Sequence, residues 1–219
     1  MNAPNETLVD PAFLFRFQWS IQRDKLSWST KGLSLPEACR VPDIGILAGR
    51  SAAADVRCAW SPDAIGWSVD VTQRAKSLWC REGRLEESDA LQVWIDTRCA
   101  PGIHRATSYC HHFAFLPTGG GPRKESPIAM AIPIARAKSH PKAIDVAKLQ
   151  VVSRVRHEGY HLSCKIPRTQ LTGYDSANYN KLGVCWMVQD REQGPTLASV
   201  GMDYPFAEDP SLWLEAELV

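Results

Sequence analysis

The sequence has no surplus of charge of either sign. It carries 25 lysines and arginines against 24 aspartates and glutamates, which leaves a formal net charge of +1. A protein that binds nucleic acid through its phosphates carries a clustered basic excess. The charge balance therefore argues against a nucleic-acid partner. The apolar share of 44% is also too high for a disordered chain, which lacks the residues needed to form a core.

Long apolar runs are missing as well. A membrane-spanning helix needs about 20 consecutive, mostly apolar residues, and no stretch approaches that length. A secretory signal places basic residues before an apolar segment of about 7 to 15 residues. The first basic residue here is Arg16, and it interrupts the apolar run 12–17. We therefore expect a cytoplasmic protein with no membrane partner.

Cysteine is present, but not in a pattern that predicts disulfide bonds or a metal site. The count is odd, the spacings are wide, and no Cys-x-x-Cys pair occurs. We expect every thiol to be reduced and packed as a small apolar side chain, and we expect no metal or other cofactor. The seven are Cys39, Cys58, Cys80, Cys99, Cys110, Cys164 and Cys185.

Alternation of apolar and polar residues dominates what the sequence does contain. In segment 91–96, Leu91, Val93 and Ile95 alternate with other side chains. This period of two is typical of half-buried antiparallel strands. In segment 108–115, we expect every second residue from Tyr109 onward to face the core. The same period recurs in segments 13–18, 55–60, 67–72, 108–115, 161–166 and 182–188.

Turn signals separate these segments, and helical patterns are few. Eight or more short strands punctuated by proline and glycine are typical of a sandwich or jelly roll. Short helical turns are expected in 139–148 and 167–171, and 117–142 is expected to be a long surface excursion. The sequence predicts one all-β domain over residues 1–219. It is expected to be a single antiparallel β-sandwich, jelly-roll-like, with at most short helices.

The segment His157-Glu158-Gly159-Tyr160-His161 matches a zinc-peptidase motif. On a helix, this spacing places two histidine ligands and a general base on one face. The flanking residues here alternate as strands do, and Glu158-Gly159 suits the two-residue turn of a hairpin. Gly159 would also weaken a helix by about 1 kcal/mol relative to alanine. The sequence therefore favours a β-hairpin over a zinc metallopeptidase.

One face of the predicted sheet is polar but carries a large aromatic residue. If Leu91 faces the core, then Gln92, Trp94 and Asp96 face the other way. An aromatic ring can stack on a sugar while carboxylates and amides bind its hydroxyls. Our hypothesis is therefore a ligand-binding site with Trp94 as the exposed stacking platform. Its polar partners are Gln92, Asp70, Asp96 and His112.

The alternative is that a loop covers Trp94, with 117–142 as the candidate cover. An exposed Trp94 favours binding, whereas a buried Trp94 favours a structural or protein-interaction sandwich that has lost the sugar site. No phosphate loop, dinucleotide fingerprint or serine nucleophile elbow occurs in the sequence. We therefore do not expect an enzyme.

Several segments resemble the DOMON-like β-sandwich superfamily that includes carbohydrate-binding module family 9. Segment 90–98 is similar to the family strand that ends in an aspartate. Segment 159–167, with its Gly-Tyr and Ile-Pro pairs, and segment 182–190 are similar to two further family strands. The similarity covers about 68–218, although Ser163 stands where the family has an acidic residue. The resemblance implies a β-sandwich that binds a sugar or another small polar ligand on one sheet face without catalysis, and it indicates no particular protein partner.

Overall fold

The structure is a computed structural model that describes residues 17–42, 54–198 and 201–219. Strands dominate it, and the helices in the described residues are single 3-10 turns. The all-β prediction with only short helices is confirmed. The strands are β1 (Gln18–Arg23), β2 (Ala54–Ser61), β3 (Ala64–Val71), β4 (Ala90–Asp96), β5 (Cys110–Gly120), β6 (Ser126–Ala131), β7 (Gln150–Arg156), β8 (Gly159–Pro167), β9 (Lys181–Gln189), β10 (Thr196–Leu197) and β11 (Leu214–Leu218). The 3-10 turns are η2 (Glu37–Cys39), η4 (Leu85–Glu87), η5 (Val146–Lys148), η6 (Arg168–Gln170) and η7 (Pro210–Leu212).

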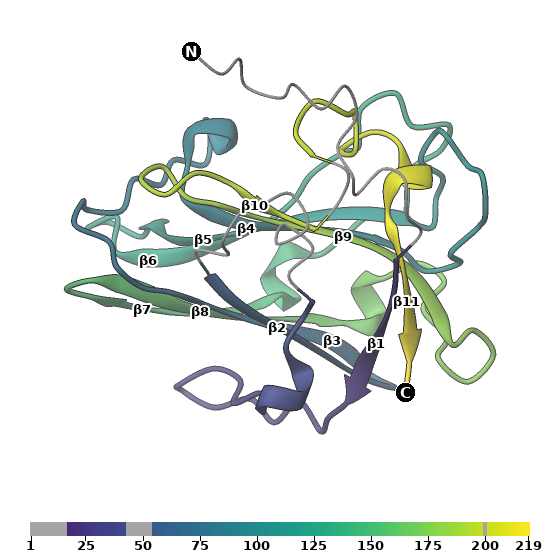
Figure 1. The fold of residues 1–219 in the computed structure, drawn as a ribbon, viewed down its shortest axis with the longest axis horizontal. Coiled ribbons are helices and arrows are strands. Elements are labelled where there is room, and N and C mark those ends of the chain that lie inside the picture. The colour runs from purple at the N-terminus through teal and green to yellow at the C-terminus, as the bar shows by residue number, and fades with distance from the viewer. Residues whose placement is uncertain (1–16, 43–53, 199–200) are drawn as a thin grey trace, which may run out of the picture.

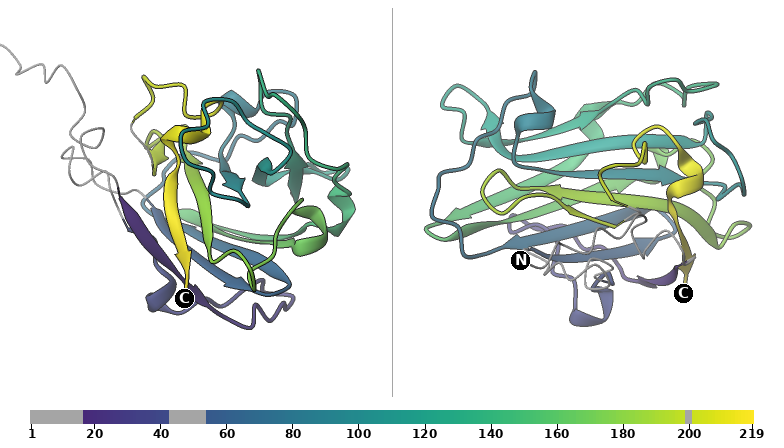
Figure 2. Two further views of the ribbon diagram at one scale, coloured as in Figure 1. Left: turned by 90° about the vertical axis from the view of Figure 1, so that its right-hand side faces the viewer. Right: turned by 45° about the horizontal axis from the view of Figure 1, so that its top comes forward.

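Two stacked sheets form the sandwich (Figure 1). Sheet A has the order β6-β5-β4-β9-β11-β1, with β10 beside β9, and sheet B has the order β1-β2-β3-β8-β7. Strand β1 therefore belongs to both sheets and joins them at one side, where Figure 2 shows it beside β11. Both pairings of β1 are parallel, whereas the other strand pairs are antiparallel, so the sandwich is mixed.

The core lies between the two sheets and follows the alternation of the sequence. Trp67 and Leu162 point inward from sheet B, and Leu91 and Phe113 point inward from sheet A, all of them fully buried. A fully buried side chain of this size stabilises the fold by roughly 1.5–3 kcal/mol. The alternating residues of these strands therefore specify the sandwich.

The outer faces of the two sheets differ. Every residue of β4 is buried, because a second apolar layer packs on the outer face of sheet A. On sheet B the segment 24–39 covers only part of the outer face, where Leu26, Leu33 and Leu35 pack near Ala59. Among the residues that the structure describes, the rest of that face carries an open groove.

Several local expectations need correction. Residues 117–142 are not one excursion, because β5 runs to Gly120 and pairs with β6. Segments 139–148 and 167–171 are helical only at η5 and η6. Strand β5 starts at Cys110, so Tyr109 precedes it and is 37% exposed. Residues 13–16 of the strand expected at 13–18 lie outside the described residues. No helix of the described residues combines the length and apolarity that a membrane crossing requires.

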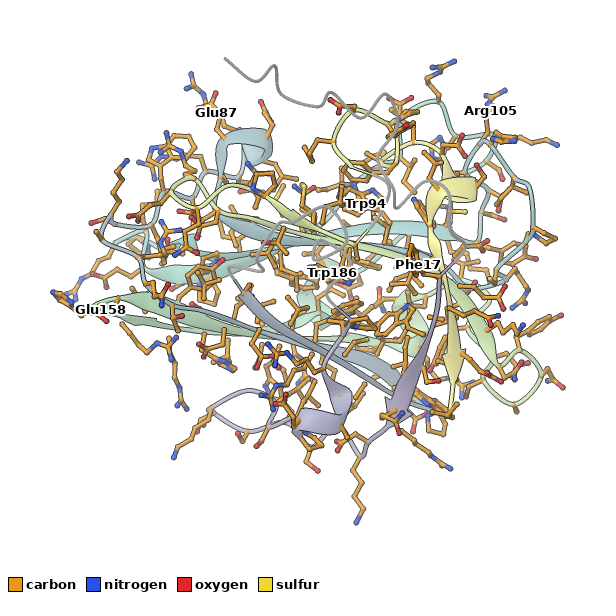
Figure 3. All side chains as sticks on the ribbon, viewed as in Figure 1. Phe17, Glu87, Trp94, Arg105, Glu158 and Trp186 are labelled. Atoms are coloured by element: carbon orange, nitrogen blue, oxygen red, sulfur yellow. The ribbon has the colours of Figure 1, made fainter. Side chains whose placement is uncertain are left out.

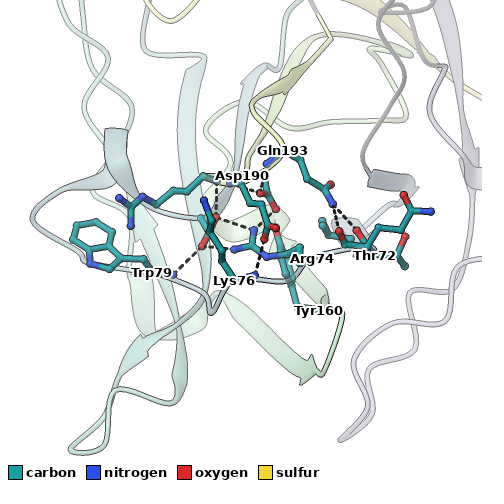
Figure 4. A network of polar contacts seen from close by, with 12 residues as sticks. Thr72, Arg74, Lys76, Trp79, Tyr160, Asp190 and Gln193 are labelled. Carbon is teal, nitrogen blue, oxygen red and sulfur yellow. Dashed lines mark hydrogen bonds and ion pairs between the residues drawn. The ribbon is translucent and has the colours of Figure 1, made fainter.

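A buried ion network ties three parts of the chain together (Figure 4). The guanidinium of Arg74 donates to Asp89, at 3.1 and 3.2 Å, and to Asp190, and all three side chains are at most 2% exposed. Asp89 also accepts the backbone N–H groups of Trp79 and Arg191, both at 2.8 Å. Burial alone lowers the pKa of Arg74, but hydrogen bonds and charge from the two aspartates outweigh it and raise that pKa. The network connects the segment after β3 to the ends of β4 and β9.

Replacing Arg74 should destabilise the protein strongly. In Arg74→Met, two buried carboxylates lose their counter-charge, so the free energy of unfolding should fall by about 3–5 kcal/mol in denaturant melts. The control is Arg84→Met, which removes an exposed arginine 3.6 Å from Glu87 and should cost less than about 1 kcal/mol. Equal losses in the two variants would contradict the central role of the network.

Candidate functional site

Trp94 points away from the core, as its place in the alternation predicts, but it is only 1% exposed. It lies on the outer side of sheet A, whereas Trp186 lies on the core side (Figure 3). Its ring stacks on His112 at 4.2 Å and meets Phe206 edge-on at 5.4 Å. The expectation of an exposed ring is wrong, because loops that carry Ile134 and Phe206 cover this face. Segment 117–142, the cover suggested from the sequence, supplies Ile134 but not Phe206. By the criterion set from the sequence, a buried Trp94 counts against a sugar site on this face and favours the structural or protein-interaction sandwich.

Three of the proposed polar partners lie on the same covered face. The His112 Nε2 is 3.0 Å from the Gln92 Oε1, and both side chains are buried. Burial lowers the pKa of His112 to about 3. The carboxylate of Asp96 accepts the backbone N–H groups of Arg98 and Ala100, at 2.9 and 3.0 Å, and burial raises its pKa. These groups are therefore engaged inside the protein.

A cavity of about 280 Å³ lies beside His112. Its walls are mainly apolar, with Ala106, Ile134 and Ile144 among the lining residues. A polyhydroxylated ligand would lose hydrogen bonds to water there and regain few from the protein. This cavity does not suit a sugar.

Asp70 lies elsewhere, on the outer face of sheet B. The structure therefore brings together four of the five expected site residues but separates Asp70 from them. It lines an open groove of about 790 Å³ on sheet B. Charged side chains dominate the lining, and no tryptophan, tyrosine or phenylalanine ring of the described residues contributes to it. They include Lys31, Asp55, Arg57, Arg154, Arg156 and His161.

The floor of the groove is a row of residues on four neighbouring strands. Asp55 on β2 pairs in register with Asp70 on β3, which pairs with His161 on β8, which pairs with Arg154 on β7. Strands lie about 4.8 Å apart, so the row spans about 14 Å. The Arg156 Nη2 donates to the Asp70 Oδ1 at 2.7 Å, and the His161 Nδ1 lies 3.4 Å from the Asp70 Oδ2. The row thus places two carboxylates, which accept hydrogen bonds, beside a histidine and an arginine, which can donate them.

One wall of the groove is the segment 24–39, which two cations hold on sheet B. Arg57 donates to the Leu35 carbonyl at 2.9 Å, and the Lys165 Nζ donates to the Leu26 carbonyl at 2.9 Å. Arg57 also donates to Asp55, a bond that lowers the pKa of Asp55 and raises that of Arg57. The segment approaches β8 closely at Gly32, whose φ is +81° and where a Cβ would lie 2.5 Å from the Ser163 Cβ. The wall is therefore fixed rather than loosely attached.

The peptidase-like motif forms the predicted β-hairpin. Strands β7 and β8 pair from Arg156↔Gly159 onward, His157 and Glu158 form the turn, and Glu158 sits at its tip (Figure 3). His161 faces the groove instead of sharing a helical face with His157. Within the described ranges, no group of three or more His, Cys, Asp or Glu side chains is placed to hold a metal ion.

The basic residues of the groove are not among the site residues expected from the sequence. Arg154 and Arg156 flank Val155 in β7 with the period of a strand, so their common face was readable from the sequence. What local sequence does not reveal is that this face lies beside Asp70, since that depends on the order of the strands.

Comparisons with known proteins support the fold. No protein-family model matches the sequence, and no curated protein matches it. A carbohydrate-binding module of family 9 from Caldicellulosiruptor kristjanssonii, solved in complex with cellotriose, is similar with a TM-score of 0.61 and 10% identity, over 92% of this chain and 93% of that chain. Its complex with glucose is similar with a TM-score of 0.59 and 12% identity, over 94% and 96% of the two chains. The resemblance to family 9 is thus confirmed at the level of the fold.

Trp94→Ala should behave as a core substitution. Because Trp94 is buried against Phe206 and His112, its removal should lower the free energy of unfolding by about 3–5 kcal/mol in denaturant melts. Trp94→Phe retains an aromatic ring and should cost clearly less. A Trp94→Ala variant as stable as the wild type would show that Trp94 is not a core residue.

Two buried histidines should make the protein sensitive to acid. Burial lowers the pKa of His111 to about 4 and that of His112 to about 3, from an ordinary value of 6.5. Below pH 6.5 the unfolded chain binds protons that the folded protein does not, so stability is full above pH 6.5 and falls as the pH drops towards 4. The slope should be up to about 1.4 kcal/mol per pH unit for each histidine.

Denaturant melts between pH 7 and 4.5 measure this slope. The double variant His111→Gln/His112→Gln should be less stable at pH 7, because it loses the contacts of both rings, yet should show a flatter dependence on pH. An identical slope in variant and wild type would mean that other groups cause the acid sensitivity.

Proposed function

We propose that this protein is a non-catalytic carbohydrate-binding module whose ligand binds in the groove on the outer face of sheet B. One observation carries the proposal. The outer face of sheet A is buried under loops, whereas the row from Asp55 to Arg154 on sheet B stays open and carries donors and acceptors.

The chemistry of this row suits sugar hydroxyls. A hydroxyl both donates and accepts, so it can pair with the carboxylate of Asp70 and with the guanidinium of Arg154 or Arg156. Hydrogen bonds to charged partners are shorter and stronger than neutral ones. The similar family 9 structures hold cellotriose and glucose, which supports a sugar as the ligand on this fold.

The groove does not favour glycoside hydrolysis. Hydrolysis of that type uses two carboxyl groups, one of them an acid with a raised pKa. The hydrogen bond from Arg57 lowers the pKa of Asp55 and makes it a poor proton donor. Binding without bond cleavage is therefore the better interpretation.

Asp70→Asn tests the site. A glycan array identifies a ligand of the wild type, and calorimetry then measures its affinity for wild type and variant. We expect Asp70→Asn to weaken binding by about tenfold or more, because a charged acceptor is lost, with little change in melting temperature.

The matched control is Asp203→Asn, an exposed aspartate in the loop region that follows β10. It should bind as the wild type does. Unchanged affinity in Asp70→Asn would mean that the ligand does not bind in the groove. A wild type that binds no glycan would favour the alternative, a structural or protein-interaction sandwich.

A further inference from the structure

The groove on sheet B is positively charged although the chain as a whole is nearly neutral. Four permanent cations line it against two carboxylates, while the full sequence carries a net charge of only +1. The cations are Lys31, Arg57, Arg154 and Arg156, and the carboxylates are Asp55 and Asp70.

Two of these cations are already paired within the protein. Arg57 bonds to Asp55 at 2.8 Å, and Arg156 bonds to Asp70 at 2.7 Å. Lys31 and Arg154 differ, since neither side chain has a hydrogen bond or ion pair with any residue that the structure describes. They lie on different parts of the groove, one on the 24–39 wall and the other on β7. Among the described residues, the groove therefore presents two cations that no carboxylate pairs with.

The basic surface continues past the end of β7. A second hollow of about 320 Å³ shares Val155 and Arg156 with the groove and is lined also by Lys76 and His157. The two hollows thus meet at Arg156. A ligand longer than one sugar unit could run from the row on sheet B towards Lys76 without leaving cationic surroundings.

We infer that the ligand is an acidic saccharide, with carboxylate or sulfate groups that bind Arg154 and Lys31. This inference rests on the proposed function and adds the chemical class of the sugar. The planar guanidinium of Arg154 can hold an anionic group through two parallel hydrogen bonds. The hydroxyls of the sugar would face Asp70 and His161 in the same row. Because no tryptophan, tyrosine or phenylalanine ring of the described residues lines the groove, charge replaces ring stacking as the main source of affinity.

The same lack of tryptophan, tyrosine and phenylalanine rings among the described lining residues argues against single-stranded nucleic acid. Proteins that bind single strands combine a basic groove with aromatic side chains on which bases stack. The groove offers the charge but not the stacking surface.

Calorimetry with matched probes tests the inference. The probes are a trigalacturonate, its neutral methyl ester, a sulfated disaccharide and an oligothymidylate. The proteins are the wild type, Arg154→Gln and Lys31→Gln. Arg84→Gln serves as the control, because it removes one exposed positive charge beside η4, outside the groove. Melting curves of each variant establish that it is folded.

We expect the wild type to bind at least one acidic saccharide about tenfold more tightly than the neutral ester. Arg154→Gln should remove about tenfold of that affinity and weaken binding of the neutral ester clearly less, because only the acidic probe loses a charge partner, and Lys31→Gln should act in the same direction. Added salt should weaken the acidic probe selectively, since these charges are exposed. The trigalacturonate and the sulfated disaccharide distinguish carboxylate from sulfate as the anionic group.

Three outcomes would overturn the inference. If the neutral ester binds in the groove as tightly as the acidic probes and Arg154→Gln has no effect, the acidic class is wrong while the proposed function stands. If none of these saccharides binds, the acidic class is wrong, and the glycan array decides whether the proposed function fails with it. If oligothymidylate binds more tightly than either acidic saccharide and depends on Arg154, the groove is a nucleic-acid site.

Discussion

The ion network of Arg74, Asp89 and Asp190 is the constraint on which this end of the sandwich depends. Its charges are buried, so each must keep its partner. Arg74 and Asp89 lie near the two ends of the β3–β4 connection, and Asp190 directly follows β9. The backbone N–H of Arg74 also donates to the Glu158 carbonyl at 3.2 Å, in the turn of the β7–β8 hairpin. The network therefore helps to position the hairpin that carries the basic side of the groove.

The sandwich uses its two sheets differently. Sheet A is packed on both faces, so its outward-facing polar groups, such as Gln92 and Asp96, serve internal hydrogen bonds. Among the described residues, sheet B keeps part of its outer face in contact with solvent, and charged residues of four strands line up there. The buried sheet A thus has a structural role, whereas the exposed part of sheet B is accessible to a ligand.

Local sequence was sufficient for some of these features and not for others. The hairpin at Glu158 was predictable because turn and strand signals lie within a few residues of each other. The direction of Trp94 was also predictable from alternation, but its exposure was not, since Phe206 covers it from more than 100 residues away in the sequence. Asp70 was expected beside Trp94 because alternation tells which residues of one strand share a face. Which faces of different strands are neighbours depends instead on the order of the strands.

The position of β1 between β11 and β2 also affects how the protein folds. Gln18 lies in register with Glu215, and the backbone N–H of Arg23 donates to the Val219 carbonyl at 2.8 Å. Contacts between residues so far apart in the sequence carry a large loop-closure entropy and are associated with slow folding. During synthesis, β1 leaves the ribosome long before β11, so one edge of β1 stays unpaired until β11 has been made. An unpaired edge is a site for incorrect pairing with other chains, so a partly made chain is the form of this protein most exposed to aggregation.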